Sequence, residues 1–162
     1  MTLGVHFAID AQTAGRLLAA PDDEAVAALV EEIEEELTGI EHCDTDKAWD
    51  AIHRSLTDGR LEYDNGAYPL NAVILGGRQV HEGDDYIVAL LVPEQVREVA
   101  AAVAGVDRAA LRAGYDRIDT AEYGPEFGDE DFEYTWSNFT DLVEFLQQAA
   151  KAEAHVIFTV GL

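Results

Sequence analysis

The sequence has very little of what marks secreted or membrane-spanning proteins. Its single cysteine, Cys43, cannot form an internal disulfide, and no cationic start followed by an apolar run and a small-residue cleavage site opens the chain. The longest apolar stretches, such as residues 87–92, are far shorter than the roughly 18 residues that a membrane span requires. We therefore expect a cytoplasmic protein that does not cross a membrane.

Basic residues are also scarce. Lys and Arg number 10 against 33 Asp and Glu, which gives a formal net charge of -23. Binding to nucleic acid depends on Lys and Arg that neutralise phosphates, and anionic lipid surfaces repel a negative protein for the same reason. We therefore expect neither nucleic-acid nor membrane binding. The charge is compatible with attraction to a basic protein partner or to cations, and also with a surface that only keeps the protein soluble.

Sequence motifs for cofactor binding and catalysis are missing as well. Gly76-Gly77 and Gly83 lack the spacing and the lysine of phosphate-binding loops. Ser55 and Ser137 do not stand in the G-x-S-x-G pattern of a nucleophile elbow. We therefore predict no cofactor and lean against an enzyme.

The sequence does contain enough apolar residues, 48% of the chain, to form the core of one folded domain over residues 1–162. Residues 3–9 alternate between apolar and polar, which predicts a strand with one buried face. Residues 86–92 are apolar and rich in β-branched side chains, so we expect a buried strand there. Residues 154–160 alternate again and predict a strand at the other end.

Helical patterns occupy most of the remaining sequence, because apolar residues recur there at intervals of three and four. The first expected helix follows Asp10, with Leu17 and Leu18 facing inward, and the second follows Asp22, with Leu37 as its last apolar residue and a stop at Thr38-Gly39. A third helix is expected from about Asp46 to Leu56, capped by Asp44 or Asp46, and a short one over residues 70–75. Further helices are expected to begin at Pro93, Asp107 and about Asp129. Residues 57–69 and 116–131 are expected to form long loops.

Few strands and several helices, without strict alternation between them, predict an α+β fold. We expect it to be mainly helical, with a small sheet of about three strands. This sheet includes the N- and C-terminal segments, which pair with each other around residues 86–92, and most helices lie on one of its faces.

The run from Asp46 to Thr57, D-K-A-W-D-A-I-H-R-S-L-T, resembles a motif of the YfbM-like family of bacterial proteins, in which D-K-x-W begins a helix that ends in I-H-x-x-L-T. Further blocks at residues 69–77, 93–96 and 111–116 are similar to that family in order and spacing. The resemblance covers most of the chain and implies a compact α+β protein. It implies no activity, because the family has no settled one.

The strongest candidate for a catalytic group is His53, which follows Asp50 by three residues and Trp49 by four and so shares a helix side with both. A carboxylate beside an imidazole raises its basicity, as a general base requires. The alternative is a neutral His53 that packs under Trp49 and hydrogen-bonds a loop carbonyl, and we expect this buried arrangement. If the protein is an enzyme, its site lies near His53, with Asp50, Tyr68 and Tyr123 as further candidates.

Two other groups of polar residues suggest chemistry only weakly. Residues chemically suited to bind a metal are His42, Cys43, Asp44, Asp46 and Asp50, with His53 in reserve. Their spacing fits neither a zinc motif nor a calcium loop, so we predict no metal site. Acidic runs at residues 31–36 and 126–133 contain the carboxylates that glycoside hydrolysis requires, but exposed charge is the commoner explanation for such runs.

These observations favour a noncatalytic protein that binds a basic protein partner through acidic loops. Two alternatives stay open. One is an enzyme of unrecognised type with its site near His53, and the other is a housekeeping domain without a specific ligand. No feature of the sequence indicates an oligomeric state.

Overall fold

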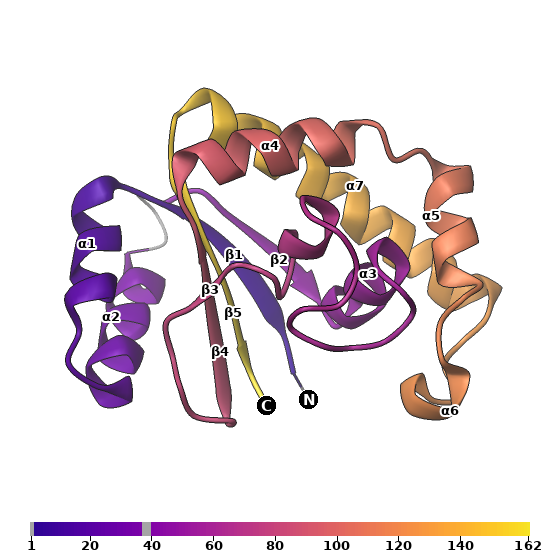
Figure 1. Ribbon diagram of the computed structural model, residues 1–162, viewed down its shortest axis with the longest axis horizontal. Coiled ribbons are helices and arrows are strands. Elements are labelled where there is room, and N and C mark those ends of the chain that lie inside the picture. Colours follow the sequence, from indigo (N-terminus) through magenta and orange to yellow (C-terminus); the bar gives the residue numbers. More distant parts are fainter. Residues whose placement is uncertain (1, 37–39) are drawn as a thin grey trace.

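A five-stranded antiparallel sheet lies at the centre of the protein, with helices on both of its faces (Figure 1). The computed structural model describes residues 2–36 and 40–162. The strands are β1 (Gly4–Ile9), β2 (His42–Asp46), β3 (Arg78–Gln79), β4 (Tyr86–Leu91) and β5 (His155–Gly161), in the order β2-β1-β5-β4-β3. The predicted α+β fold is confirmed, and the first and last strands pair as expected.

The prediction of about three strands was too low. Strand β2 has no apolar alternation, since charged residues flank Cys43 and Thr45, and β3 consists of two exposed residues. Both form because β1 and β4 present unpaired backbone edges, which the two short strands complete. The centre of the sheet is β5, which lies between β1 and β4, and not the segment at residues 86–92.

The helices follow the predicted order closely. They are α1 (Ala11–Ala19), α2 (Asp23–Glu35), α3 (Ala48–Leu56), the 3-10 helix η2 (Leu70–Ala72), α4 (Pro93–Ala104), α5 (Arg108–Tyr115), α6 (Thr120–Tyr123) and α7 (Asp129–Lys151). The expected loop at residues 57–69 is confirmed, whereas the one at residues 116–131 contains α6. The predicted end of the second helix, at Leu37 and Thr38-Gly39, lies outside the described residues. No helix in the described part of the chain is long and apolar enough to cross a membrane.

Helix starts depend on local capping, which explains why they were predictable. The carboxylates of Asp10, Asp22 and Asp107 each accept the backbone N–H three residues further on, at 2.7 to 2.9 Å. Inward faces are less certain from sequence. Leu17 is buried, but Leu18 is 41% exposed, because neighbouring residues point about 100° apart on a helix and Leu17 occupies the side facing the sheet.

Two hydrophobic clusters fill the space on the two faces of the sheet. Helices α1 and α2 cover one face, and most other helices cover the opposite face, as predicted (Figure 1). The prediction of a single buried face for β1 is therefore wrong. His6 alternates with the buried Phe7, yet it is only 1% exposed because the second helical layer covers it. Its Nε2 donates a hydrogen bond to the backbone oxygen of Val73 at 2.8 Å.

Candidate functional site

A cleft of about 500 Å³ opens where α3, α6 and the beginning of α7 meet beside the start of β1. We call it the α3–α7 cleft. Its lining residues are Thr2, Asp46, Lys47, Trp49, Asp50, Tyr123, Glu126, Asp131 and Tyr134. Four of these are carboxylates, three are aromatic and one is basic. Two of the catalytic candidates named from the sequence, Asp50 and Tyr123, lie in this cleft, together with Asp46 from the residues suited to a metal.

The turn from β2 into α3 forms one wall of the cleft. Asp46 has a left-handed backbone, with φ of 51°, and its carboxylate accepts a hydrogen bond from the Tyr134 hydroxyl. The same hydroxyl accepts the backbone N–H of Lys47 at 3.0 Å. The prediction that Asp44 or Asp46 caps α3 is therefore wrong. Lys47 occupies the cap position without a side-chain cap, because Asp46 is bound to Tyr134 and Asp44 accepts the N–H of Asp46.

A buried arginine supports the floor of the cleft. The side chain of Arg54 is 3% exposed, and its guanidinium binds Asp50 at 2.6 Å and Glu122 at 3.1 Å. It also lies over the ring of Tyr123, 5.7 Å from the centroid. Burial raises the pKa of Asp50 above its ordinary value, although Arg54 acts in the opposite direction. A charge as deeply buried as that of Arg54 requires carboxylate partners, so Arg54 fixes the position of the half-buried Asp50.

Asp131 at the start of α7 is held by two tyrosines from different elements. Its Oδ2 accepts hydrogen bonds from the hydroxyls of Tyr115 at 2.6 Å and Tyr123 at 2.7 Å. Burial, together with the neighbouring carboxylate, raises the pKa of both phenols, so they stay protonated donors. Asp131 thereby joins α5, α6 and α7. No hydrogen bond to its Oδ1 forms within residues 2–36 and 40–162.

His53 lies outside the cleft and is fully buried, as expected for the noncatalytic arrangement. Its Nε2 donates to Oδ1 of Asn65 at 2.8 Å, so the acceptor is a side-chain carbonyl in the loop at residues 57–69. The amide of Asn65 in turn donates to Thr57 and Asp58. Of the two candidates His53 and Tyr123, only Tyr123 lines the cleft. Tyr68 does not line the cleft either, and its hydroxyl donates to Glu98 at 2.9 Å.

We expect stability to fall as the pH drops from about 6.5 towards 4, because two histidines are buried in their neutral form. Burial lowers the pKa of His6 from 6.5 to about 4, and it also lowers the pKa of His53. In the unfolded chain both rings bind a proton near pH 6.5. The unfolded state therefore binds more protons in this range, and His6 alone lowers the free energy of unfolding by about 3 kcal/mol.

An NMR titration of the folded protein checks this pH dependence directly. Both ring signals should titrate below 6.5, and His6→Gln should flatten the pH dependence of the urea midpoint between pH 6.5 and 4.5. A His53 signal that titrates above 6.5 would contradict the buried arrangement and would favour a general base beside Asp50.

The residues suited to a metal are not brought together. No three His, Cys, Asp or Glu residues in the described chain are grouped closely enough to hold a metal ion. His42 is exposed and Cys43 is buried, because successive side chains of β2 point to opposite faces. Burial also raises the pKa of the Cys43 thiol to about 11, which disfavours the thiolate that metals bind.

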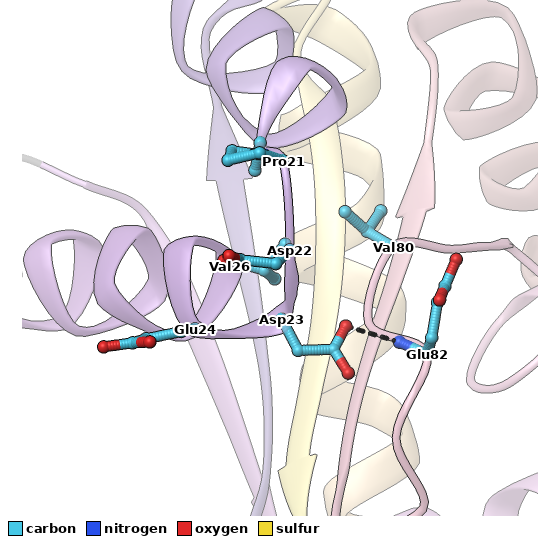
Figure 2. Close-up of a pocket in the computed structure, with 8 residues that line it drawn as sticks. Pro21, Asp22, Asp23, Glu24, Val26, Val80 and Glu82 are labelled. Atoms are coloured by element: carbon cyan, nitrogen blue, oxygen red, sulfur yellow. Dashed lines mark hydrogen bonds between the residues drawn. The ribbon is translucent and has the colours of Figure 1, made fainter.

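Another depression, of about 470 Å³, lies beside the beginning of α2 (Figure 2). Here the Asp23 carboxylate points toward the backbone nitrogen of Glu82, and one of its oxygens accepts a hydrogen bond from that N–H at 2.8 Å. Its second oxygen accepts a hydrogen bond from the N–H of Gly83 at 2.9 Å. Asp23 thus attaches the loop between β3 and β4 to α2. Both oxygens of Asp23 already accept hydrogen bonds, and none of the residues that line this depression in the described chain is aromatic. We therefore assign Asp23 and the depression a structural role.

Most acidic side chains are left without a basic partner among the described residues. The arginines that form ion pairs are Arg16, Arg54, Arg60, Arg108 and Arg112. With 33 acidic residues in the chain, a large negative excess remains after this pairing. In the α3–α7 cleft, Lys47 is the single basic residue against four carboxylates.

Comparisons with known proteins agree with the fold. The family model described as "Domain of unknown function (DUF1877)" matches residues 1–159. A solved structure, the protein of unknown function YfbM from Escherichia coli, is similar with a TM-score of 0.69 and 20% identity, over 98% of this chain and 99% of that chain. No curated protein matches the sequence. At this identity the structural likeness shows the fold alone.

Proposed function

Since the chain belongs to the DUF1877 family, a domain of unknown function, we propose its role from the chemistry of its surface. The protein binds a basic protein partner, held mainly by electrostatic attraction, and does not act as a catalyst. The observation that carries this proposal is the α3–α7 cleft, where carboxylates outnumber the single lysine on a chain of net charge -23.

Charge complementarity explains what such a surface does in recognition. An acidic protein attracts a basic one over distances of about 10 Å at moderate salt, which accelerates their encounter and repels acidic competitors. The unpaired carboxylates described above supply this attraction. The fixed groups of the cleft then offer a place where one part of the partner can be held in a defined orientation.

Capture from a lysate at increasing salt tests this proposal. We expect the immobilised protein to retain a discrete basic partner at about 0.15 M salt and to release it as the salt concentration rises. An unrelated acidic protein of similar net charge serves as the control, since it removes general ion-exchange binders. Partners whose retention does not depend on the salt concentration, or that bind the control equally well, would contradict the proposal. Such a result would favour a housekeeping domain without a specific ligand.

A second candidate function, an enzyme of unrecognised type, is favoured by one observation. Asp50 lies in the α3–α7 cleft beside Tyr123 with a raised pKa, and such carboxylates are often general acids. His53, which the sequence suggested as the base, does not line this cleft. Turnover of a chromogenic ester, phosphate or glycoside that disappears in Asp50→Asn but survives in Glu24→Gln would favour this candidate.

A further inference from the structure

The α3–α7 cleft has aromatic walls as well as negative charge. Trp49, Tyr123 and Tyr134 line it from three different elements. Tyr134 is the most open of the three, since it is 37% exposed, while Trp49 is 3% exposed. Arg54 lies over the ring of Tyr123. Aromatic faces attract cations and stack on the planar guanidinium group, so they add a preference that carboxylates alone do not provide. At about 500 Å³, the cleft is large enough for one long side chain.

Three of the four carboxylates of the cleft, those of the aspartates, are fixed in place by protein groups at one oxygen each. Asp46 is bound by Tyr134, Asp50 by Arg54, and Asp131 by two phenols, while the second oxygen of each has no hydrogen-bond partner in the described part of the chain. Side chains held in this way lose little conformational freedom when a donor arrives. The cleft is therefore prepared to accept several hydrogen bonds from one cationic group.

Arginines of the protein itself show how neighbouring carboxylates and rings are used. Arg54 binds two carboxylates while its guanidinium lies over Tyr123. Arg112 binds Asp116 and Asp129, at 3.0 and 2.9 Å, and lies 5.0 Å from the centroid of Phe132. The same combination of side chains lines the cleft, where Lys47 is the one basic lining residue and Arg54 engages Asp50 and the ring of Tyr123 from outside the lining.

A bare metal ion fits the cleft poorly. No three of the acidic groups are close enough together to coordinate one ion. Carboxylates spread around a cleft instead suit a cation with several donors in different directions, and the five N–H donors of a guanidinium meet this condition.

We propose that the α3–α7 cleft receives one arginine side chain of a basic protein partner, stacked against the exposed ring of Tyr134 and hydrogen-bonded to the carboxylates of the cleft. This inference rests on the proposed function. It adds a single anchoring residue to the general attraction between the two surfaces, as interface hot spots commonly provide.

The experiment uses the full-length, ¹⁵N-labelled protein and small probes. N-acetyl-arginine-amide is the main probe, and N-acetyl-citrulline-amide, which has nearly the same shape without the charge, is its control. We expect the arginine probe to shift the amide signals of Lys47 and Tyr134 and the indole signal of Trp49, and the citrulline probe to leave them unchanged. N-acetyl-lysine-amide should bind more weakly than the arginine probe, because its ammonium cannot stack on the rings.

Glu126 is the best residue to vary, because it lines the cleft and its carboxylate is exposed and takes no part in the ion pairs of the described chain. Glu126→Gln should weaken the arginine probe by roughly threefold, and Glu126→Lys by about tenfold. Glu24→Gln is the matched control, since it removes the same charge from the depression beside α2. It should leave the affinity of the probe unchanged.

Several results would overturn the arginine site. They are signal shifts scattered outside the cleft, equal effects of Glu126→Gln and Glu24→Gln, and binding of the lysine or citrulline probe as strongly as the arginine probe. If a basic partner is captured but both Gln variants weaken it equally, the proposed function stands and the arginine site fails. If the arginine probe occupies the cleft but no basic partner is captured, the proposed function fails and the preference of the cleft for arginine stands.

Discussion

Replacing Trp49 with alanine is expected to lower the free energy of unfolding by about 3 to 5 kcal/mol, as for other large aromatic residues in a core. The side chain is 3% exposed and its ring centroid lies 5.8 Å from that of Phe158. Its Nε1 also donates to the backbone oxygen of Thr2 at 3.1 Å. The variant therefore leaves a cavity between α3 and the sheet and removes a wall of the α3–α7 cleft.

Urea denaturation followed by circular dichroism measures this loss without depending on tryptophan fluorescence. Trp136→Ala is the matched control, because Trp136 lies half-buried on α7 and its removal therefore loses less buried apolar area than the removal of Trp49. We expect a smaller decrease in the urea midpoint for this control. A midpoint for Trp49→Ala equal to that of the unchanged protein would show that the indole does not support the core.

Replacing Gly114 with alanine is expected to destabilise the fold by about 3 kcal/mol, at the upper end of the range for overpacking. A Cβ atom at this position would lie 1.9 Å from the backbone oxygen of Ser55. Helices α5 and α3 touch at this point through their backbones. The added methyl group meets main-chain atoms that no rotamer change can move, so α5 must shift away from α3 and disturb the packing of both helices.

Gly15→Ala provides a control with the opposite sign. Gly15 is also within a helix, α1, but a Cβ atom there would have no neighbour within 4 Å. We expect this variant to stabilise the protein by about 0.5 to 1 kcal/mol, because alanine loses less backbone freedom than glycine on folding. Chemical denaturation of both variants tests the pair. Stabilisation of equal size in the two would mean that helix propensity, and not the contact with Ser55, decides the outcome, and equal destabilisation would also contradict a special role for that contact.

Elements with a strong local signal were predicted well from the sequence. The capping aspartates and Pro93 marked helix starts because a helix end requires backbone N–H groups to be satisfied by nearby residues. The apolar patterns of β1, β4 and β5 marked strands because each buries at least one face. Strands β2 and β3 escaped prediction, since their pairing with β1 and β4 depends on neighbours distant in the sequence.

The candidate site was predicted only in part, and His53 shows the reason. Its spacing from Asp50 on one helix was correct, but spacing along a helix does not reveal what covers that helix. The loop that carries Asn65 buries His53 and supplies its hydrogen-bond acceptor. Asp50 and Tyr123, both named as candidates from the sequence, line the same cleft, but the cleft itself was not foreseen. Its other wall includes Tyr134, which lies 88 positions after Asp46 in the chain.

The sequence by itself determined the excess of negative charge, the α+β class and the positions of most helix starts, because these depend on composition and on residues a few positions apart. Only the tertiary structure decided that a second layer of helices buries His6, and that α3, α6 and α7 gather acidic and aromatic side chains around one cleft. Such an arrangement arises from the packing of elements far apart in the chain. The physical reason is that burial and proximity are properties of the whole fold, and a local pattern records only the side that a segment turns inward.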